Sequence, residues 1–312
     1  MKLIVMIPAH NEEGTIGNVI RDIPRKIDGI DEVQVIVMED GSTDRTAEIA
    51  RDAGADYVIS RKERLGLAKA FEEGLNLAVE IGADIIVNID ADNQYNPNEI
   101  PKLIRPILDG EADIVLGNRQ IDKLDHMPLS KKMGNKIATF VTSKLSGIHI
   151  SDAQTGFRAF SRRAAMMLSI SSEYTYTQET IIQSAYKKLK IVEVPVEFRK
   201  RDGKSRLISS VWNYGKKAGA TVLLTYLNYK PLKAFFIMGS LLVLAGLLLS
   251  LKIIIQFFIT GSVSPYYPTL VLISILVVIG FQIMIMGLLA SMIKHNREIL
   301  EHVLFRIREM KK

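Results

Sequence analysis

The chain has 312 residues, of which 48% are hydrophobic and 24% charged, and it contains no cysteine. This hydrophobic content excludes an intrinsically disordered chain, and the lack of cysteine excludes disulfides, thiolate metal sites and cysteine nucleophiles. The formal net charge is +6, but much of the positive charge lies beside an apolar C-terminal part. A basic segment beside a membrane accounts for that charge better than nucleic acid does, so we expect no nucleic-acid partner.

Apolar segments alternate with helical patterns from residue 2 to residue 116. We expect strands at 2–7, 33–38, 57–60, 85–89 and 114–116, and helices at 14–22, 44–53 and 66–81. Ser42 or Thr43 is expected to cap the second helix, because hydroxyl side chains accept the unpaired N–H groups of a helix start. Strands that alternate with helices form a mostly parallel sheet covered on both faces, so the sequence predicts an α/β fold.

Polar clusters follow three of these strands, at 11–12, 39–42 and 90–92. Ligands of parallel sheets bind beyond the carboxyl ends of the strands, so the clusters are expected to share one site. Asp90 and Asp92 could together hold a hard divalent cation through oxygen and leave positions for phosphate oxygens. Two acids after a strand are a weak signal alone, but Asp40, two strands earlier, and Gln94, just after the pair, strengthen it. Asp40 could accept a hydrogen bond from a base or ribose, or serve only the turn in which it lies.

The C-terminal part has the composition of a membrane domain. Residues 234–293 contain one charged residue, Lys252, and no acid. A turn-rich break at 261–265 divides them into halves that can each cross about 30 Å of hydrocarbon at about 1.5 Å per residue. Buried helices of a soluble protein are the alternative, but two adjacent apolar segments of this length are rare in a soluble core. We therefore expect two transmembrane helices.

Lysine and arginine residues around these segments predict their orientation. Lys230 and Lys233 precede the first segment, Lys294 and Arg297 follow the second, and the loop between the segments has neither residue type. By the positive-inside rule, we expect an integral protein of the cell membrane with its first domain and both termini in the cytoplasm. The last residues, 294–312, are expected to form a cytoplasmic helix.

A basic stretch lies just before the first apolar segment. Residues 199–217 contain seven lysine or arginine residues and a single acid, Asp202. Residues 209–230 mix apolar and aromatic side chains with lysines, which is typical of an amphipathic helix at a membrane surface. A solvated charge run is the alternative, but the position beside a membrane favours contact with anionic headgroups or a phosphate. The expected organisation is a domain at 1–208, a juxtamembrane helix at 209–230 and transmembrane helices within 231–293.

Several motifs in chain order resemble glycosyltransferase family 2 and, more narrowly, its dolichyl-phosphate mannose and glucose synthases. They are IPAHNEE at 7–13, EDGSTDRT at 39–46, Gly66 with Ala70 and Gly74, DADNQ at 90–94, TGFR at 155–158, TQE at 177–179, and EVPV at 193–196 with GKSR at 203–206. The resemblance implies a GT-A fold with a Rossmann-like, mostly parallel sheet. It also implies metal-dependent transfer of a hexose, with inversion, from GDP-mannose or UDP-glucose to a polyprenyl or dolichyl phosphate. The product would be a lipid-linked sugar for protein or cell-surface glycosylation.

The resemblance further implies roles by position. The residues expected to bind the sugar-nucleotide donor are Pro8, His10, Glu12, Asp40, Gly66, Asp90 and Gln94. The expected ligands of a divalent cation, Mn²⁺ or Mg²⁺, are Asp90, Asp92 and Gln94. The residues expected in catalysis are Asp92, Arg119 and Glu179. Those expected to bind the acceptor or a phosphate are Lys131, Asn135, Arg199, Arg201, Lys204 and Arg206. Two positions depart from the family pattern. His10 stands where an aromatic residue is usual, and Glu39 stands where aspartate is usual.

The acceptor decides whether the reaction needs a base. A phosphate monoester, with a second pKa of about 6, is mostly dianionic at pH 7, whereas a hydroxyl must be deprotonated. Glu179 stands where hydroxyl-using relatives place a catalytic carboxylate, so it could be a base or could orient a neighbouring group. Arg158 could pair with Glu179 or form an ion pair at the edge of the core. The two apolar segments favour a lipid phosphate as the acceptor.

Two other hypotheses stay open. A membrane glycosyltransferase could use a hydroxyl of a glycan or lipid with Glu179 as base, although the Gln-x-x-Arg-Trp motif of processive relatives is absent. A non-catalytic membrane scaffold could bind a sugar nucleotide, which the intact Asp90, Asp92 and Arg119 argue against. A homo-oligomer also stays open, since two transmembrane helices can pack within one chain or between chains.

Overall fold

The structure is a computed structural model that describes residues 1–310 apart from 126, 171–175, 201–218, 220–225 and 228. The chain forms two units, one comprising Met1–Leu223 with Phe305–Lys312 and the other comprising Leu224–Leu304. The expected domain boundary at residue 208 and most of the expected juxtamembrane helix at 209–230 lie outside the described residues.

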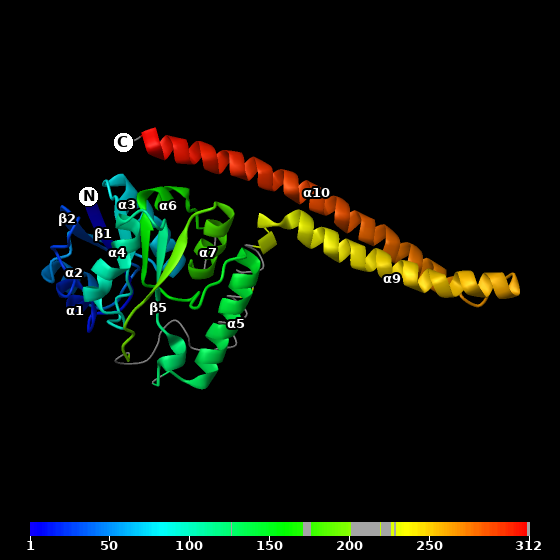
Figure 1. Ribbon diagram of the computed structural model, residues 1–312, viewed down its shortest axis with the longest axis horizontal. Helices are drawn as coiled ribbons and strands as arrows, with labels where there is room; N and C mark the ends of the chain where they lie inside the picture. The colour runs from blue at the N-terminus through cyan, green and yellow to red at the C-terminus, as the bar shows by residue number, and fades with distance from the viewer. Residues whose placement is uncertain (126, 171–175, 201–218, 220–225, 228, 311–312) are drawn as a thin grey trace. The chain divides into compact units, whose positions relative to one another are not determined.

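The first unit is built on a mixed sheet, which has seven strands in the described part of the chain (Figure 1). The strands are β1 (Lys2–Ala9), β2 (Glu32–Glu39), β3 (Tyr57–Ser60), β4 (Ile85–Asn88), β5 (Ile114–Asn118), β6 (Arg158–Ser161) and β7 (Ile191–Pro195). Their order is β3-β2-β1-β4-β6-β5-β7, and only the pairs that β6 makes with β4 and β5 are antiparallel among these strands. The five predicted strands are confirmed, and β6 and β7 have no counterpart in the prediction.

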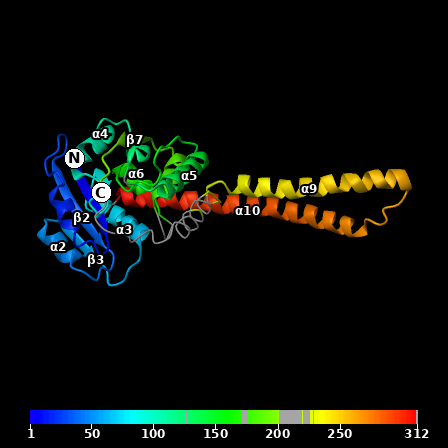
Figure 2. The same ribbon diagram turned by 90° about the horizontal axis from the view of Figure 1, so that it is seen from below.

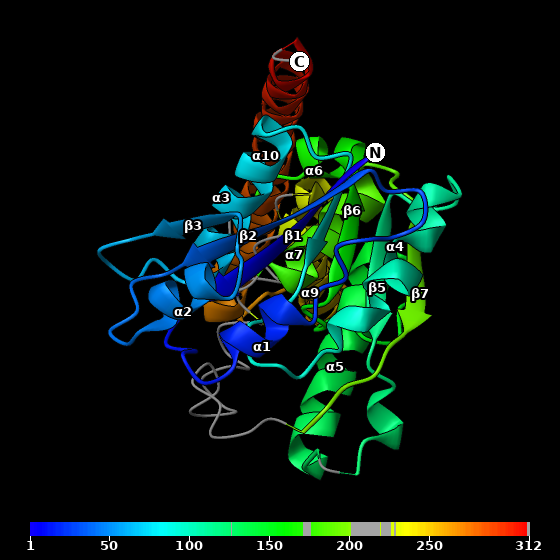
Figure 3. The ribbon, with the colours of Figure 1, turned by 90° about the vertical axis from the view of Figure 1, so that its left-hand side faces the viewer.

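Helices cover both faces of this sheet. They are α1 (Ile16–Arg21), α2 (Thr46–Asp52), α3 (Leu67–Glu80), α4 (Ile100–Leu108), α5 (Leu129–Ser146), α6 (Arg162–Met167) and α7 (Thr177–Tyr186). Residues of β1 alternate between two cores, because successive side chains of a strand point to opposite faces. Leu3, Val5 and Ile7 pack with residues of α1 and α4, whereas Ile4 and Met6 pack with residues of α3, α6 and α7. Figure 3 shows these helices around the sheet.

The start of α2 differs from the prediction that Ser42 or Thr43 caps it. The helix begins at Thr46, and its N-cap residue makes no side-chain cap. Ser42 Oγ instead accepts a hydrogen bond from the backbone N–H of Asn11 at 3.0 Å, and Asp44 Oδ1 accepts one from the N–H of Thr46 at 3.0 Å. The Ser42 hydroxyl therefore joins the loops that follow β1 and β2, instead of capping the helix.

The apolar C-terminal segments form two long helices, α9 (Pro231–Thr260) and α10 (Tyr267–Met310). Each is long and apolar enough to cross a membrane, and the two lie side by side in Figures 1 and 2. A Cβ atom at Gly280 would lie 2.8 Å from the carbonyl oxygen of Gly239, so glycine permits this close approach of the helices. The predicted break at 261–265 is confirmed, and residues 294–310 continue α10 as a helix.

Candidate active site

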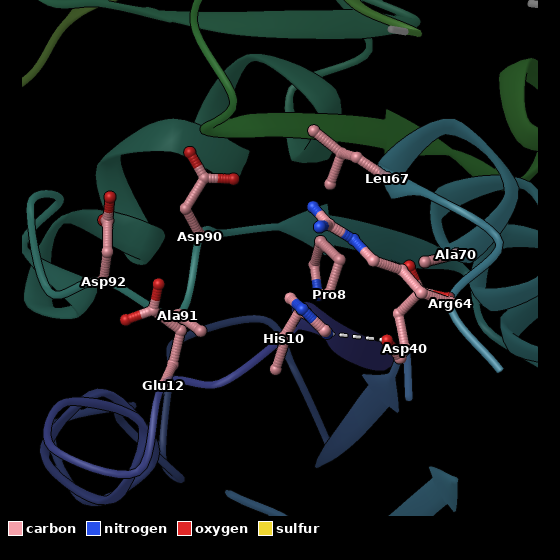
Figure 4. A pocket seen from close by; sticks show the side chains of 11 residues that line it. Pro8, His10, Glu12, Asp40, Arg64, Leu67, Ala70, Asp90, Ala91 and Asp92 are labelled. Atoms are coloured by element: carbon pink, nitrogen blue, oxygen red, sulfur yellow. Dashed lines mark hydrogen bonds between the residues drawn. The ribbon is translucent and has the colours of Figure 1, made fainter. Parts of the chain in front are cut away.

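A pocket lies beyond the carboxyl ends of β1, β2 and β4, beside the start of α3 (Figure 4). It is lined by Pro8, Ala9, His10, Glu12, Asp40, Arg64, Leu67, Ala70, Asp90, Ala91 and Asp92. The three polar clusters that follow separate strands therefore contribute to one pocket. Parallel strands end at the same edge of a sheet, which is why residues far apart in the sequence meet there.

Asp90 and Asp92 present their carboxylates to this pocket directly after β4 (Figure 4). Both side chains belong to half-buried residues, and Ala91 between them is buried. Mg²⁺ and Mn²⁺ sites of this kind use one or two carboxylates and take other ligands from water and phosphate. The described residues contain no group of three His, Asp or Glu side chains that could hold a metal alone. The pair therefore fits a cation that is shared with a phosphate.

The carboxylate of Asp90 packs against Gly156, in the loop before β6. A Cβ atom at this glycine would lie 2.7 Å from Asp90 Oδ1 and 2.8 Å from its Cγ. Gly156 is itself fixed, because its N–H donates to Tyr95 Oη at 3.0 Å and its carbonyl accepts from Asn88 Nδ2 at 2.7 Å. Burial raises the pKa of Tyr95 to about 12, so its hydroxyl stays protonated. A fixed wall behind Asp90 fits a metal ligand that must be held in one orientation.

Asp40 anchors the loop that precedes α3. It is buried, and its Oδ1 accepts hydrogen bonds from the N–H of Leu65 at 2.8 Å and from Arg61 Nη1 at 3.0 Å. Its Oδ2 accepts one from the N–H of Gly66 at 2.8 Å, so Gly66 binds Asp40 and does not itself line the pocket. His10 Nδ1 donates to the carbonyl oxygen of Asp40 at 2.8 Å (Figure 4), since a carbonyl can only accept. Among the predicted donor-binding residues, Asp40 is thus hydrogen-bonded to both His10 and Gly66.

Gln94 and Arg199 are joined to each other, outside the pocket lining. The N–H of Gln94 donates to Asp92 Oδ1 at 3.2 Å, which orients that carboxylate. The N–H of Arg199 donates to the carbonyl of Gln94 at 2.7 Å, and Gln94 Nε2 donates to the carbonyl of Arg199 at 3.2 Å. These bonds hold residue 199 beside the loop that follows β4. The other predicted phosphate ligands of this stretch, Arg201, Lys204 and Arg206, lie outside the described residues.

A second polar cluster connects Arg119, which follows β5, to α5 through Asp152. Arg119 donates to the fully buried Asp152 through Nε at 2.6 Å and through Nη2 at 2.8 Å. Asn135 of α5 donates to the same carboxylate at 3.3 Å. Burial acts to lower the pKa of Arg119, but Tyr95 and Asp152 raise it above its ordinary value. Burial acts to raise the pKa of Asp152, but Arg119 holds it below its ordinary value, so the two groups form an ion pair. Lys131, one turn before Asn135, is exposed.

Glu179 lies in the first turn of α7, where it is buried and outside the pocket lining. Gln183 Nε2 donates to its Oε1 at 3.1 Å. The predicted ion pair of Arg158, with Glu179 or at the core edge, is wrong for the described residues, because Arg158 is fully buried and its bonds go to neutral oxygens. The acceptors are the carbonyls of Ala153, Thr155 and Thr177 and the hydroxyl of Thr180. Burial lowers the pKa of Arg158 to about 10, and its bonds tie the loop before β6 to the start of α7.

Four residues of these clusters are missing from the predicted site: Arg64, Tyr95, Asp152 and Gly156. Gly156 belongs to the TGFR motif, so the motif marks the segment without indicating the contact with Asp90. Tyr95 directly follows the DADNQ motif, and its contact with Gly156 likewise depends on the fold. Asp152 is a single acid with no local pattern, and only its position opposite Arg119 reveals its role. Arg64 is one of several cations in the loop before α3, and the sequence does not distinguish the one that faces the pocket.

The chain is similar to several proteins of known class. Residues 4–168 match the model of the family described as glycosyl transferase family 2. The chain is 34% identical over 218 residues to the UDP-N-acetylglucosamine–dolichyl-phosphate N-acetylglucosaminyltransferase of Methanococcus voltae, which covers 63% of this chain and 85% of the relative. It is 34% identical over 205 residues to the dolichyl-phosphate hexose transferase of Haloferax volcanii, over 66% of this chain and 86% of the relative.

Among solved structures, the fold is similar to glucosyl-3-phosphoglycerate synthase from Mycobacterium tuberculosis, crystallised with Mn²⁺, UDP-glucose and phosphoglyceric acid. The TM-score is 0.57 at 26% sequence identity, and the match covers 72% of this chain and 78% of that one. This similarity agrees with the mixed sheet, with the pocket at its edge, and with the predicted GT-A fold.

Proposed function

Because the chain belongs to glycosyl transferase family 2 and is a glycosyltransferase, we propose that it transfers a hexose from a sugar nucleotide to a polyprenyl or dolichyl phosphate. The donor is GDP-mannose or UDP-glucose. The observation that carries the proposal is the carboxylate pair of Asp90 and Asp92 at a pocket, in a chain with two helices apolar enough to cross a membrane. Relatives named for transfer to dolichyl phosphate support this acceptor.

On the donor side, Asp90 and Asp92 would hold a Mn²⁺ or Mg²⁺ ion against the diphosphate of the sugar nucleotide. The structurally similar synthase was crystallised with Mn²⁺ and UDP-glucose, which supports this assignment. When bound, such a cation neutralises negative charge that develops on a leaving nucleoside diphosphate. Gly156 keeps Asp90 in place and the N–H of Gln94 orients Asp92, so both ligands are preorganised. The reaction is a single displacement with inversion at the sugar carbon.

On the acceptor side, Arg119 would bind a phosphate. Asp152 occupies its Nε and Nη2 atoms, which leaves Nη1 to donate to a phosphate oxygen. The ion pair also fixes the orientation of the guanidinium and keeps it charged. A phosphate monoester, with a second pKa of about 6, is mostly dianionic at pH 7 and attacks without a general base. The location of Glu179 outside the pocket lining fits an acceptor of this kind.

The outer face of α5 favours an acceptor that is held in a membrane. Leu129, Met133, Ile137 and Phe140 follow one another at helical spacing and are 82%, 64%, 59% and 68% exposed. Asn135, on the inner face, is buried and bonded to Asp152. A helix with an apolar outer face and flanking lysines is typical of one that lies at a lipid surface. In such a position α5 would bring lipid headgroups close to the Arg119 cluster.

The membrane arrangement follows from the same proposal. We place α9 and the apolar part of α10 across the membrane, with the catalytic unit and both termini in the cytoplasm. The lysine and arginine residues that flank the two helices, and their absence from the connecting loop, support this orientation. Donor and lipid acceptor would then meet at the cytoplasmic membrane surface.

A transfer assay with the purified full-length protein in detergent tests this function. Labelled GDP-mannose, UDP-glucose and UDP-N-acetylglucosamine are offered separately, each with Mn²⁺, Mg²⁺ or EDTA, and with or without dolichyl phosphate. We expect label to enter the organic phase from GDP-mannose or UDP-glucose, and only when both lipid phosphate and a divalent cation are present. Transfer that persists in EDTA would contradict the metal assignment. No transfer from any donor would favour the non-catalytic scaffold.

A further inference from the structure

The lining of the pocket, in the part of the chain that the structure describes, has more acidic than basic side chains. Four carboxylates line it, those of Glu12, Asp40, Asp90 and Asp92. Arg64 is the only lysine or arginine among the described residues of the lining. A nucleoside diphosphate adds further negative charge, and like charges in a partly buried site repel one another strongly. A cation at Asp90 and Asp92 would offset part of this charge, and among the lining residues that the structure describes Arg64 contributes a guanidinium.

Arg61 and Arg64, three residues apart in one loop, have different surroundings. Arg61 is mostly buried and forms ion pairs with Asp40, at 3.0 Å, and with Glu73. Arg64 is exposed and has no hydrogen bond or ion pair with any residue that the structure describes. Figure 4 shows its guanidinium directed into the pocket, toward the side on which Asp90 lies. Arg61 is therefore part of the loop's structure, whereas Arg64 keeps all its donors for a ligand.

The backbone that carries Arg64 is held firmly against the end of β2. Asp40 accepts hydrogen bonds of 2.8 Å from the N–H groups of both Leu65 and Gly66. Gly41 has φ of +66°, and a Cβ atom there would lie 2.8 Å from the backbone nitrogen of Arg64. The left-handed conformation and this close approach both require glycine. Asp40 and Gly41 thus fix the position from which the Arg64 side chain extends.

We propose that Arg64 binds the diphosphate of the sugar-nucleotide donor, with Asp40 and Gly41 as its positioning residues. The inference rests on the proposed function and names a ligand for that same pocket. A guanidinium suits this work because it stays charged and offers paired N–H donors to phosphate oxygens. As the bond between the sugar and the diphosphate breaks, negative charge grows on the leaving diphosphate. Arg64 then stabilises the transition state more than the bound donor.

Titration calorimetry of the purified full-length protein with UDP and GDP, in excess Mn²⁺, tests this assignment. Arg64→Gln should weaken binding of whichever diphosphate the wild type binds by about 10- to 100-fold, the range for a lost charge-assisted hydrogen bond. Arg64→Lys, which keeps the charge, should recover most of the affinity. Lys62→Gln is the matched control, because Lys62 is an exposed cation of the same loop outside the pocket lining, and it should bind as the wild type does.

Binding of the corresponding nucleoside monophosphate, measured in the same way, shows whether Arg64 contacts the diphosphate or the base and ribose. Arg64→Gln should lower the affinity for the nucleoside monophosphate less than it lowers the affinity for the diphosphate. Unchanged diphosphate affinity in Arg64→Gln, or an equal loss for both nucleotides, would overturn the inference and leave the proposed function standing. A wild type that binds neither UDP nor GDP would overturn the proposed function and this inference together.

Discussion

Gly156 faces the carboxylate of Asp90 so closely that a methyl group at position 156 would lie 2.7 Å from Oδ1 and 2.8 Å from Cγ. Tyr95 and Asn88 hold the backbone of Gly156 through its N–H and its carbonyl. The glycine therefore cannot easily move away from an added side chain. The aspartate would have to move instead, and with it one of the two proposed metal ligands.

The first prediction concerns this contact. Gly156→Ala should lower Mn²⁺ affinity in the presence of UDP or GDP by about 10- to 100-fold, the usual effect of disturbing the surroundings of a metal ligand. Electron paramagnetic resonance of free Mn²⁺ measures the affinity directly. Gly134→Ala is the matched control, because a Cβ atom there has nothing within 4 Å. Equal Mn²⁺ affinity in both variants would contradict the role given to Gly156.

The Arg119–Asp152 pair should contribute strongly to stability. Asp152→Asn keeps the shape of the side chain but leaves the buried guanidinium without its counter-charge, which costs about 3–5 kcal/mol of unfolding free energy. Asp109→Asn breaks the Arg105–Asp109 pair, whose side chains are 65% and 39% exposed, and should cost about 1 kcal/mol or less. Thermal unfolding in detergent compares the two variants. Similar losses of stability in Asp152→Asn and Asp109→Asn would mean that Asp152 does not stabilise the fold through Arg119.

The same pair predicts how stability depends on pH. Burial alone would raise the pKa of Asp152, but Arg119 holds it below the ordinary value of 3.8. A carboxylate with a lowered folded pKa stabilises the folded protein above its unfolded pKa, and loses this effect as pH falls through the folded value. The difference in melting temperature between the wild type and Asp152→Asn should therefore be constant from about pH 7 to 5 and narrow only below about pH 4. A difference in melting temperature that became smaller between pH 7 and pH 5 would contradict the ion pair of Asp152 with Arg119.

The apolar face of α5 gives a prediction for the acceptor. Ile137→Asn should reduce transfer to dolichyl phosphate in liposomes by about tenfold, since burial of one isoleucine in lipid is worth about 1.5–3 kcal/mol. Transfer to a short, water-soluble prenyl phosphate should not change, because that acceptor does not need the membrane. Ile59→Asn, at an exposed isoleucine of the edge strand β3, is the control. If Ile137→Asn reduced transfer to both acceptors, the side chain of Ile137 would stabilise the fold and would not contact the membrane.

Sequence patterns predicted those strands that are mostly apolar. β1, β2 and β4 are such strands, and the order of a parallel sheet then brings Asp40 and Asp90 to one edge. β6 begins at Arg158 and pairs in the antiparallel direction between β4 and β5, while Glu193 interrupts the apolar pattern of β7. Short strands whose environment is set by neighbours distant in the sequence carry no periodic signal of their own.

Partners in the site were harder to predict than its acidic residues. The acids after β2 and β4 are visible because their position relative to a strand is local information. Asp152 acquires its role only from Arg119, and Gly156 only from Asp90, through contacts that the fold creates. Arg158 is a charged residue that suggests an ion pair, yet the acceptors of its hydrogen bonds are neutral oxygens, three carbonyls and the hydroxyl of Thr180. Such contacts depend on tertiary geometry, which no local pattern encodes.

The most direct test of the central claim compares dolichyl phosphate with dolichol as acceptor, using the wild type and Asp92→Asn with the preferred labelled donor and Mn²⁺. The wild type should transfer sugar to dolichyl phosphate and not to dolichol, because the phosphate is the nucleophile. Asp92→Asn should lose nearly all transfer, because one of two proposed metal ligands is gone. Transfer to dolichol, or an Asp92→Asn variant as fast as the wild type, would contradict the account.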